Sequence, residues 1–205
     1  MGLRNLPPTL LHLDSDASLL QKSCLQLTLS NAVRETFKAK GPIAMSDARG
    51  STSGAIHHYD EPSEVPHDIQ KYWYNRYDIW SKYDEGIWMT DDVWFGVTPE
   101  PVANKIAEHV AAAPKTKTIL IDAFAGAGGN AIAFARSGRW KQIFAVEKDP
   151  DALACAKHNA ELYGVAKMIW WIEGDIFEVL GRQLKAAAKN AVVFASPPWG
   201  GEKTR

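Results

Sequence analysis

The chain has 205 residues, of which 46% are hydrophobic and 23% are charged, and its net charge is -1. This composition is ordinary for a globular protein with one sizeable core, and the charge gives no general nucleic-acid-binding signature. The only two cysteines are too few and too far apart in sequence to indicate a disulfide framework or a metal site. We therefore expect an intracellular, reducing compartment, and no apolar run reaches the length of a membrane span.

The first 65 residues carry weak structural signals. Leucines between residues 10 and 29 show no sustained period, and residues 41–66 are rich in Gly, Ser and Pro. We expect a disordered or weakly helical arm and linker over 1–65, with at most a short helix over 17–39.

Aromatic residues recur at roughly helical spacing after this arm. Tyr72, Trp73, Tyr77 and Trp80 are the members of this series. The pattern predicts a helix whose buried face accounts for most of them, while Trp80 is a candidate for a functional role.

A strand, a glycine-rich loop and a helix are predicted next. The apolar run 118–121 leads into Asp122-Ala-Phe-Ala-Gly126-Ala-Gly128-Gly129-Asn130, and a helical pattern covers 131–136. Glycines let the backbone pass close to a ligand, and a helix start offers unpaired N–H groups. This arrangement predicts a nucleotide pocket, in which Asp122 favours a ligand with cationic or hydroxyl groups.

Three more strands are predicted in alternation with helices. The strands cover 142–146, 168–173 and 191–195; the helices cover 149–164 and 177–189. Such alternation indicates an α/β fold with a parallel sheet, whose ligands bind at the carboxyl ends of the strands. Glu147, at the end of its strand, is placed to accept hydrogen bonds from a ribose. Polar groups follow each of the four strands: Asp122, Glu147, Asp175 and Ser196.

Two interpretations of the glycine loop compete. Gly126-x-Gly128-x-x-Ala131 satisfies a dinucleotide-binding pattern, but four residues separate the strand from its first glycine. Ser196-Pro197-Pro198-Trp199 resembles the Pro-Pro loop of S-adenosylmethionine-dependent methyltransferases that act on amino nitrogens of bases or amides. A planar amine needs a hydrogen-bond acceptor and a flat ring for stacking, and two prolines stiffen the turn that holds it. The loop therefore favours a methyltransferase.

Longer motifs narrow this resemblance. The segments 71–87, 92–100, 122–130 and 196–201 occur in order. Together they resemble the catalytic domain of the trimethylguanosine synthase family of RNA cap guanine-N2 methyltransferases. The resemblance implies a Rossmann-like methyltransferase sheet at 115–205, preceded by a small helical extension at 66–114. It also implies S-adenosylmethionine as methyl donor, no metal, and a nuclear or nucleolar enzyme. Its implied substrate is the 7-methylguanosine cap of small nuclear and nucleolar RNAs, methylated twice at N2.

The same resemblance implies roles for individual residues. Trp199 would stack on the methylated guanine, Ser196 and Pro197 would hold its N2, and Lys71 would contact the cap phosphates. No residue is assigned as a metal ligand or general base. The cofactor contacts would be Trp80, Thr98, Asp122, Gly126, Gly128, Asn130, Glu147 and Asp175.

The sequence ends at Arg205, shortly after the Pro-Pro loop. Because the family sheet normally has further strands there, the resemblance implies a truncated chain with only the first four strands. The strand at 191–195 is then expected to be an uncovered edge. Two other functions remain open: a methyltransferase for adenine N6 or glutamine, and an inactive fragment that binds cofactor or cap.

Overall fold

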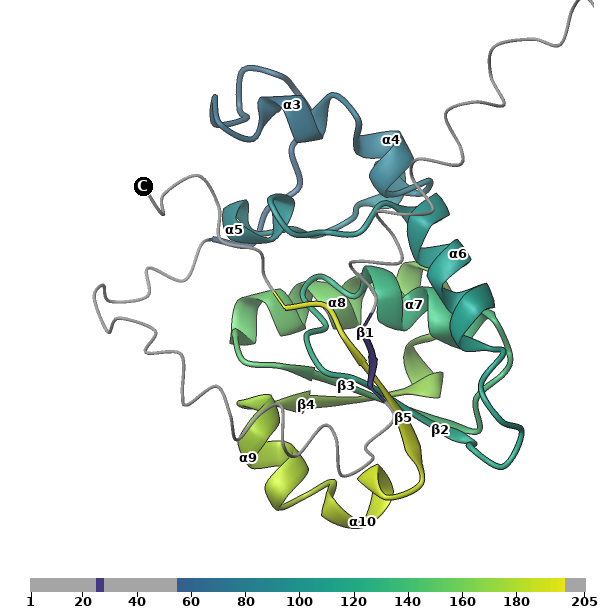
Figure 1. Cartoon of the computed structure of the whole chain (residues 1–205). Helices are drawn as coiled ribbons and strands as arrows, with labels where there is room; N and C mark the ends of the chain where they lie inside the picture. The colour runs from purple at the N-terminus through teal and green to yellow at the C-terminus, as the bar shows by residue number, and fades with distance from the viewer. Residues whose placement is uncertain (1–24, 28–54, 198–205) are drawn as a thin grey trace, which may run out of the picture.

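The computed structural model describes residues 25–27 and 55–197 (Figure 1). Its centre is a five-stranded sheet in the order β1-β5-β2-β3-β4. Strands β5, β2, β3 and β4 are parallel, which confirms the predicted α/β class with a parallel sheet. The strands are β1 (Leu25–Leu27), β2 (Ile119–Asp122), β3 (Gln142–Glu147), β4 (Ile169–Glu173) and β5 (Ala191–Ala195).

The edge of β5 is paired, contrary to expectation. Strand β1 runs antiparallel to it, with Leu25 opposite Ala195 and Leu27 opposite Val193. A strand edge presents unpaired N–H and C=O groups, and a short extended segment can satisfy them wherever it lies in the sequence. The predicted helix over 17–39 is therefore wrong at Leu25–Leu27; the rest of that range lies outside the described residues.

Helices cover both faces of the sheet (Figure 1). Leu120 packs in the core with helices α6 (Glu100–Val110), α7 (Gly129–Arg136) and α8 (Pro150–Leu162). The next residue, Ile121, packs with α9 (Ile176–Gly181) and α10 (Lys185–Ala188). Successive side chains of a strand point to opposite faces, so β2 contributes to both cores.

The helix predicted over 177–189 is interrupted. Helix α9 ends at Gly181, and Arg182 leaves the helical region with φ -118° and ψ -81°. Glycine is a weak helix former, so the chain can turn here before α10 begins at Lys185. The prediction of one continuous helix is wrong.

Residues 66–114 form several short helices rather than one long one. Trp73 and Trp80 are buried as the aromatic pattern predicts, whereas Tyr77 is 50% exposed. No helix of the described residues is long and apolar enough to cross a membrane. Besides α6, the elements here are α3 (Gln70–Trp73), α4 (Arg76–Ile79), the 3₁₀ turn η2 (Tyr83–Glu85) and α5 (Asp91–Trp94); a further 3₁₀ turn, η3 (Ala166–Met168), precedes β4.

Candidate functional site

The polar residues at the carboxyl ends of the four parallel strands lie along one edge of the sheet. Asp122 is opposite Ala145 of β3 and Phe194 of β5, and Glu147 is opposite Glu173 of β4. Asp175 lies two residues after the end of β4, and Ser196 directly follows β5. The structure therefore places Asp122, Glu147, Asp175 and Ser196 at the carboxyl edge of the sheet.

Asp122 is a buried acid with unused hydrogen-bonding capacity. Its side chain is fully buried, and Oδ1 accepts a long hydrogen bond of 3.4 Å from the Phe124 N–H. Oδ2 has no hydrogen-bond partner among the described residues. Burial, together with the nearby charge of Glu147, raises the pKa of Asp122 to about 7. A buried acceptor without a partner is costly unless a ligand supplies one, so the position suits a cationic or hydroxyl-bearing ligand.

Glu147 fixes the loops around it. Oε2 accepts from the Gly126 N–H at 2.8 Å, while Oε1 accepts from the Lys148 and Asp149 N–H groups at 2.8 and 3.0 Å. A carboxylate offers about four lone-pair sites, so capacity remains for a ribose hydroxyl. The residue predicted as a ribose ligand thus also builds the loop.

The glycine loop needs glycine at two places. Gly126 and Gly128 have φ of 51° and 95°, in the left-handed region that side chains disfavour. A Cβ on Gly128 would also lie 3.2 Å from the Cα of Ala156 on α8. These residues let the backbone turn tightly from β2 into α7.

Residues of the helical extension meet the start of α7. Asn130 Nδ2 donates to Thr98 Oγ1 at 3.0 Å, and a Cβ on Gly129 would lie 3.8 Å from the Trp80 ring. The Asn130 Oδ1 and Trp80 Nε1 atoms are buried and have no hydrogen-bond partner in the described part of the chain. Trp80, Thr98 and Asn130 therefore come together beside the glycine loop.

The remaining predicted residues are less enclosed. Asp175 caps α9, since its Oδ1 accepts from the Phe177 N–H at 2.8 Å. Ser196 is half-buried and Pro197 is exposed at the end of β5. Lys71 is exposed, with Nζ 4.9 Å from the centre of the Tyr72 ring. Trp199 lies outside the described residues.

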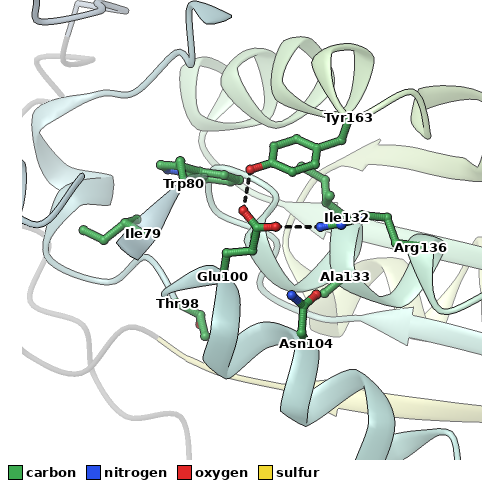
Figure 2. A pocket seen from close by; sticks show the side chains of 10 residues that line it. Ile79, Trp80, Thr98, Glu100, Asn104, Ile132, Ala133, Arg136 and Tyr163 are labelled. Atoms are coloured by element: carbon green, nitrogen blue, oxygen red, sulfur yellow. Dashed lines mark hydrogen bonds and ion pairs between the residues drawn. The ribbon is translucent and has the colours of Figure 1, made fainter. Parts of the chain in front are cut away.

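A half-buried carboxylate that sequence reasoning missed joins the extension to the core. Figure 2 shows Glu100, the first residue of α6, pointing toward Tyr163 and Arg136. The Tyr163 hydroxyl and Arg136 Nη1 each donate to it at 2.6 Å, and the Ser81 N–H donates at 2.9 Å. Burial alone would raise the pKa of Glu100, but these hydrogen bonds outweigh it and lower the pKa to about 2.

The surroundings of Glu100 form a small pocket next to the predicted cofactor residues (Figure 2). The sequence held one partial signal, an acid directly after Pro99 at a helix start. The sequence could not identify the partners of Glu100, because Tyr163 lies 63 residues away. The pocket is lined by Ile79, Trp80, Thr98, Glu100, Asn104, Gly129, Ile132, Ala133, Arg136 and Tyr163.

This arrangement suits binding and alignment of a ligand. Acceptors on Asp122 and Asn130 that no other described residue pairs with flank a glycine loop, and the extension closes one side with Trp80. Among the described residues, no group of three or more His, Cys, Asp or Glu side chains is placed to hold a metal ion.

Comparison with known proteins identifies the family. The family described as RNA cap guanine-N2 methyltransferase matches residues 117–204. Trimethylguanosine synthase of Schizosaccharomyces pombe is 42% identical over 138 residues, which cover 67% of this chain and 56% of that protein. Its Saccharomyces cerevisiae counterpart is 39% identical over 132 residues, covering 64% and 41%. A release factor glutamine methyltransferase of Geobacter sulfurreducens is 32% identical over 94 residues, covering 46% and 30%.

The chain spans about half the length of the curated relatives it matches. The matched family segment contains the glycine loop, the acids at or just beyond the ends of β2, β3 and β4, and the Ser-Pro-Pro-Trp sequence. The chain therefore belongs to the RNA cap guanine-N2 methyltransferase family.

Proposed function

We propose that this chain transfers methyl groups from S-adenosylmethionine to N2 of the 7-methylguanosine cap of RNA. The observation that carries the proposal is the family match over 117–204, which includes both the glycine loop and the Ser-Pro-Pro-Trp sequence. The glycine loop would bind the methyl donor and the Ser-Pro-Pro-Trp sequence would bind the methyl acceptor, so a single segment holds the residues for both.

The residues around the glycine loop fit S-adenosylmethionine. Buried acceptor oxygens of Asp122 and Asn130 have no partner within residues 25–27 and 55–197, and they can receive hydrogen bonds from its amino-acid portion. Glu147 retains capacity for the ribose hydroxyls, and Asp175 lies after the next strand, where it can accept from the adenine amine. Trp80 closes the site from the extension.

The cap would be held by the loop after β5. An indole face attracts the positively charged 7-methylguanine ring by cation–π interaction as well as stacking, worth about 1 to 2 kcal/mol. Trp199 is assigned this role from the sequence alone. Lys71, which is exposed, is proposed for the cap phosphates.

Catalysis would depend on alignment. When bound, S-adenosylmethionine supplies a methyl group activated by a positively charged sulfur. Ser196 and the rigid Pro197 peptide would hold the guanine amine so that its lone pair faces that methyl group, and Trp199 would exclude water from one side. We assign no general base; the amine proton would pass to solvent.

We propose capped small nuclear and nucleolar RNAs as partners and the nucleus, including the nucleolus, as the location. This follows from similarity to proteins named trimethylguanosine synthase.

A second candidate is transfer to another planar amino nitrogen, on glutamine or adenine N6. The similarity to a release factor glutamine methyltransferase over 94 residues supports this second candidate. That reaction would not require a positively charged base, so substrate preference distinguishes the two functions.

Calorimetric titration of the full chain tests the proposed function. The protein would first be saturated with S-adenosylhomocysteine. The 7-methylguanosine-capped dinucleotide should then bind about tenfold more tightly than the unmethylated analogue. Trp199→Ala should abolish this preference and Trp199→Phe should retain part of it. Equal affinity for the two dinucleotides would contradict the proposed cap site.

A further inference from the structure

The Asn159 side chain joins the helical extension to the glycine loop. It lies on α8 and is fully buried. Its Oδ1 accepts from the Trp88 N–H at 2.8 Å. Its Nδ2 donates to the Trp88 and Ala127 carbonyls at 2.9 and 3.1 Å. One buried amide thus holds two backbone segments that are distant in the sequence.

The Trp88 segment is held against α8 at this point. The Trp88 ring stacks on the adjacent His158 with centroids 3.8 Å apart and planes 10° apart. His158 Nε2 also bonds to the Gly86 carbonyl at 2.8 Å. On the outer side, Met89 and His57 exchange two backbone hydrogen bonds of 2.9 and 3.0 Å. Asn159 is therefore the buried polar part of a contact that includes residues 57 and 86–89.

The other contact of Asn159 lies inside the loop proposed to hold the cofactor. Ala127 separates the two glycines with positive φ and is 3% exposed. Its carbonyl shares a planar peptide group with the Gly128 N–H, which donates to the Ala125 carbonyl at 2.8 Å. Asn159 and Ala125 together fix both ends of this peptide group, and hence the entry into α7.

We propose that Asn159 is a positioning residue that couples cofactor binding at the glycine loop to docking of the 86–90 segment. The proposal rests on the proposed function for the identity of the ligand. Since one amide bonds to both segments, ordering either of them lowers the entropy cost of ordering the other.

Only an amide meets these hydrogen-bonding demands. Aspartate in place of Asn159 could still accept from the Trp88 N–H, but it would point an oxygen at two carbonyls. A leucine of similar size would leave the Trp88 and Ala127 groups without these partners. Asn159→Asp and Asn159→Leu therefore break the coupling in two different ways.

Hydrogen exchange measured by mass spectrometry on the full chain tests the proposal. In the wild type, S-adenosylhomocysteine should slow exchange in the peptides covering 86–90 and 125–130. In both Asn159 variants, ligand-free exchange should be about tenfold faster in these two peptides, and the ligand should no longer protect 86–90. Cys155→Ala, which trims a buried side chain on the same helix, is the matched control and should retain the linked protection.

Two results would overturn the proposal. One is that both segments of the variants exchange at the same rate as in the wild type. The other is that the exchange rate rises equally throughout α8, β2 and β3, which would indicate general destabilisation. If S-adenosylhomocysteine failed to protect 125–130 of the wild type, the proposed cofactor site would be wrong. The ligand-free comparison would then still decide whether Asn159 positions both segments.

Discussion

The Glu147 carboxylate accepts the Gly126 N–H at 2.8 Å, so the acid that ends β3 holds the first glycine of the loop after β2. Its other oxygen accepts from the two residues that lead into α8. An acid at this strand end is usually considered only for its contact with a ribose. Here it also shapes the site in which that contact would occur.

Replacing Glu147 should therefore affect both folding and ligand binding. Glu147→Gln places an NH₂ group among backbone N–H donors, so at least one of them loses its acceptor. We expect a loss of about 1 to 3 kcal/mol in the free energy of unfolding, measured with urea, and weaker S-adenosylhomocysteine binding by calorimetry. Glu147→Asp, which keeps the charge on a shorter side chain, should show an intermediate loss. Unchanged stability in Glu147→Gln would contradict this role.

Asp122 should make stability depend on pH. Its folded-state pKa of about 7 is above its ordinary value of 3.8, so the folded protein binds the proton more tightly than the unfolded chain. Stability should fall as pH rises through the interval between those values and stay low above it. Asp122→Asn cannot ionise, so its melting temperature should exceed that of the wild type by a few degrees at pH 8 and equal it near pH 4.

The same substitution should have the opposite effect on binding. A cationic ligand interacts best with an ionised Asp122, so wild-type affinity for S-adenosylmethionine should increase from pH 6 to pH 8. Asp122→Asn should bind weakly at both values. Strong binding by this variant, or wild-type affinity that falls over this range, would refute the proposed contact.

The glycine loop offers a matched pair of substitutions. Gly128→Ala introduces both an unfavourable backbone conformation and a Cβ 3.2 Å from Ala156. Gly126→Ala has the positive φ of 51°, but its Cβ would have no heavy atom of the described part of the chain within 4 Å. We expect Gly126→Ala to cost about 1 kcal/mol and Gly128→Ala clearly more, as measured by urea denaturation. Equal costs would show that contact with α8 is unimportant.

Glu100 should stabilise the docking of the extension in a pH-dependent manner. Its pKa of about 2 is below its ordinary value of 4.5, so its contribution should be fully present above 4.5 and be lost as pH falls toward 2. Glu100→Gln should remove this dependence and cost about 1 to 3 kcal/mol at neutral pH. Tyr163→Phe, which deletes one donor, should cost less. Thermal melts between pH 2 and pH 7 measure this dependence. A melting temperature that falls toward low pH as steeply in Glu100→Gln as in the wild type would contradict the role of Glu100.

Local signals in the sequence predicted much of the sheet. Strand β5 was found because an apolar run is bounded by Asn190 and Ser196, and α8 because Asp149 and Pro150 begin a helix that Gly164 follows. The polar strand ends followed from parallel topology, which brings them to one edge. These features depend on residues that are close in sequence.

Long-range contacts could not be predicted in the same way. Asn159 bonds to Trp88, 71 residues earlier, and nothing local to either residue indicates the pairing. Strand β1 pairs with β5, which lies far away in the sequence. The three residues of β1 have no strand pattern of their own, so nothing local indicates this pairing. The break after Gly181 was missed because a single glycine is often tolerated within a helix.

Mass spectrometry of methyl transfer tests the central claim most directly. The full chain would be incubated with S-adenosylmethionine and either 7-methylguanosine-capped or plain guanosine-capped dinucleotide, and the methylated atom located by fragmentation. The account predicts addition at guanine N2 of the 7-methylated cap alone. Equal addition to both caps, or no addition while S-adenosylmethionine and cap are both bound, would contradict it.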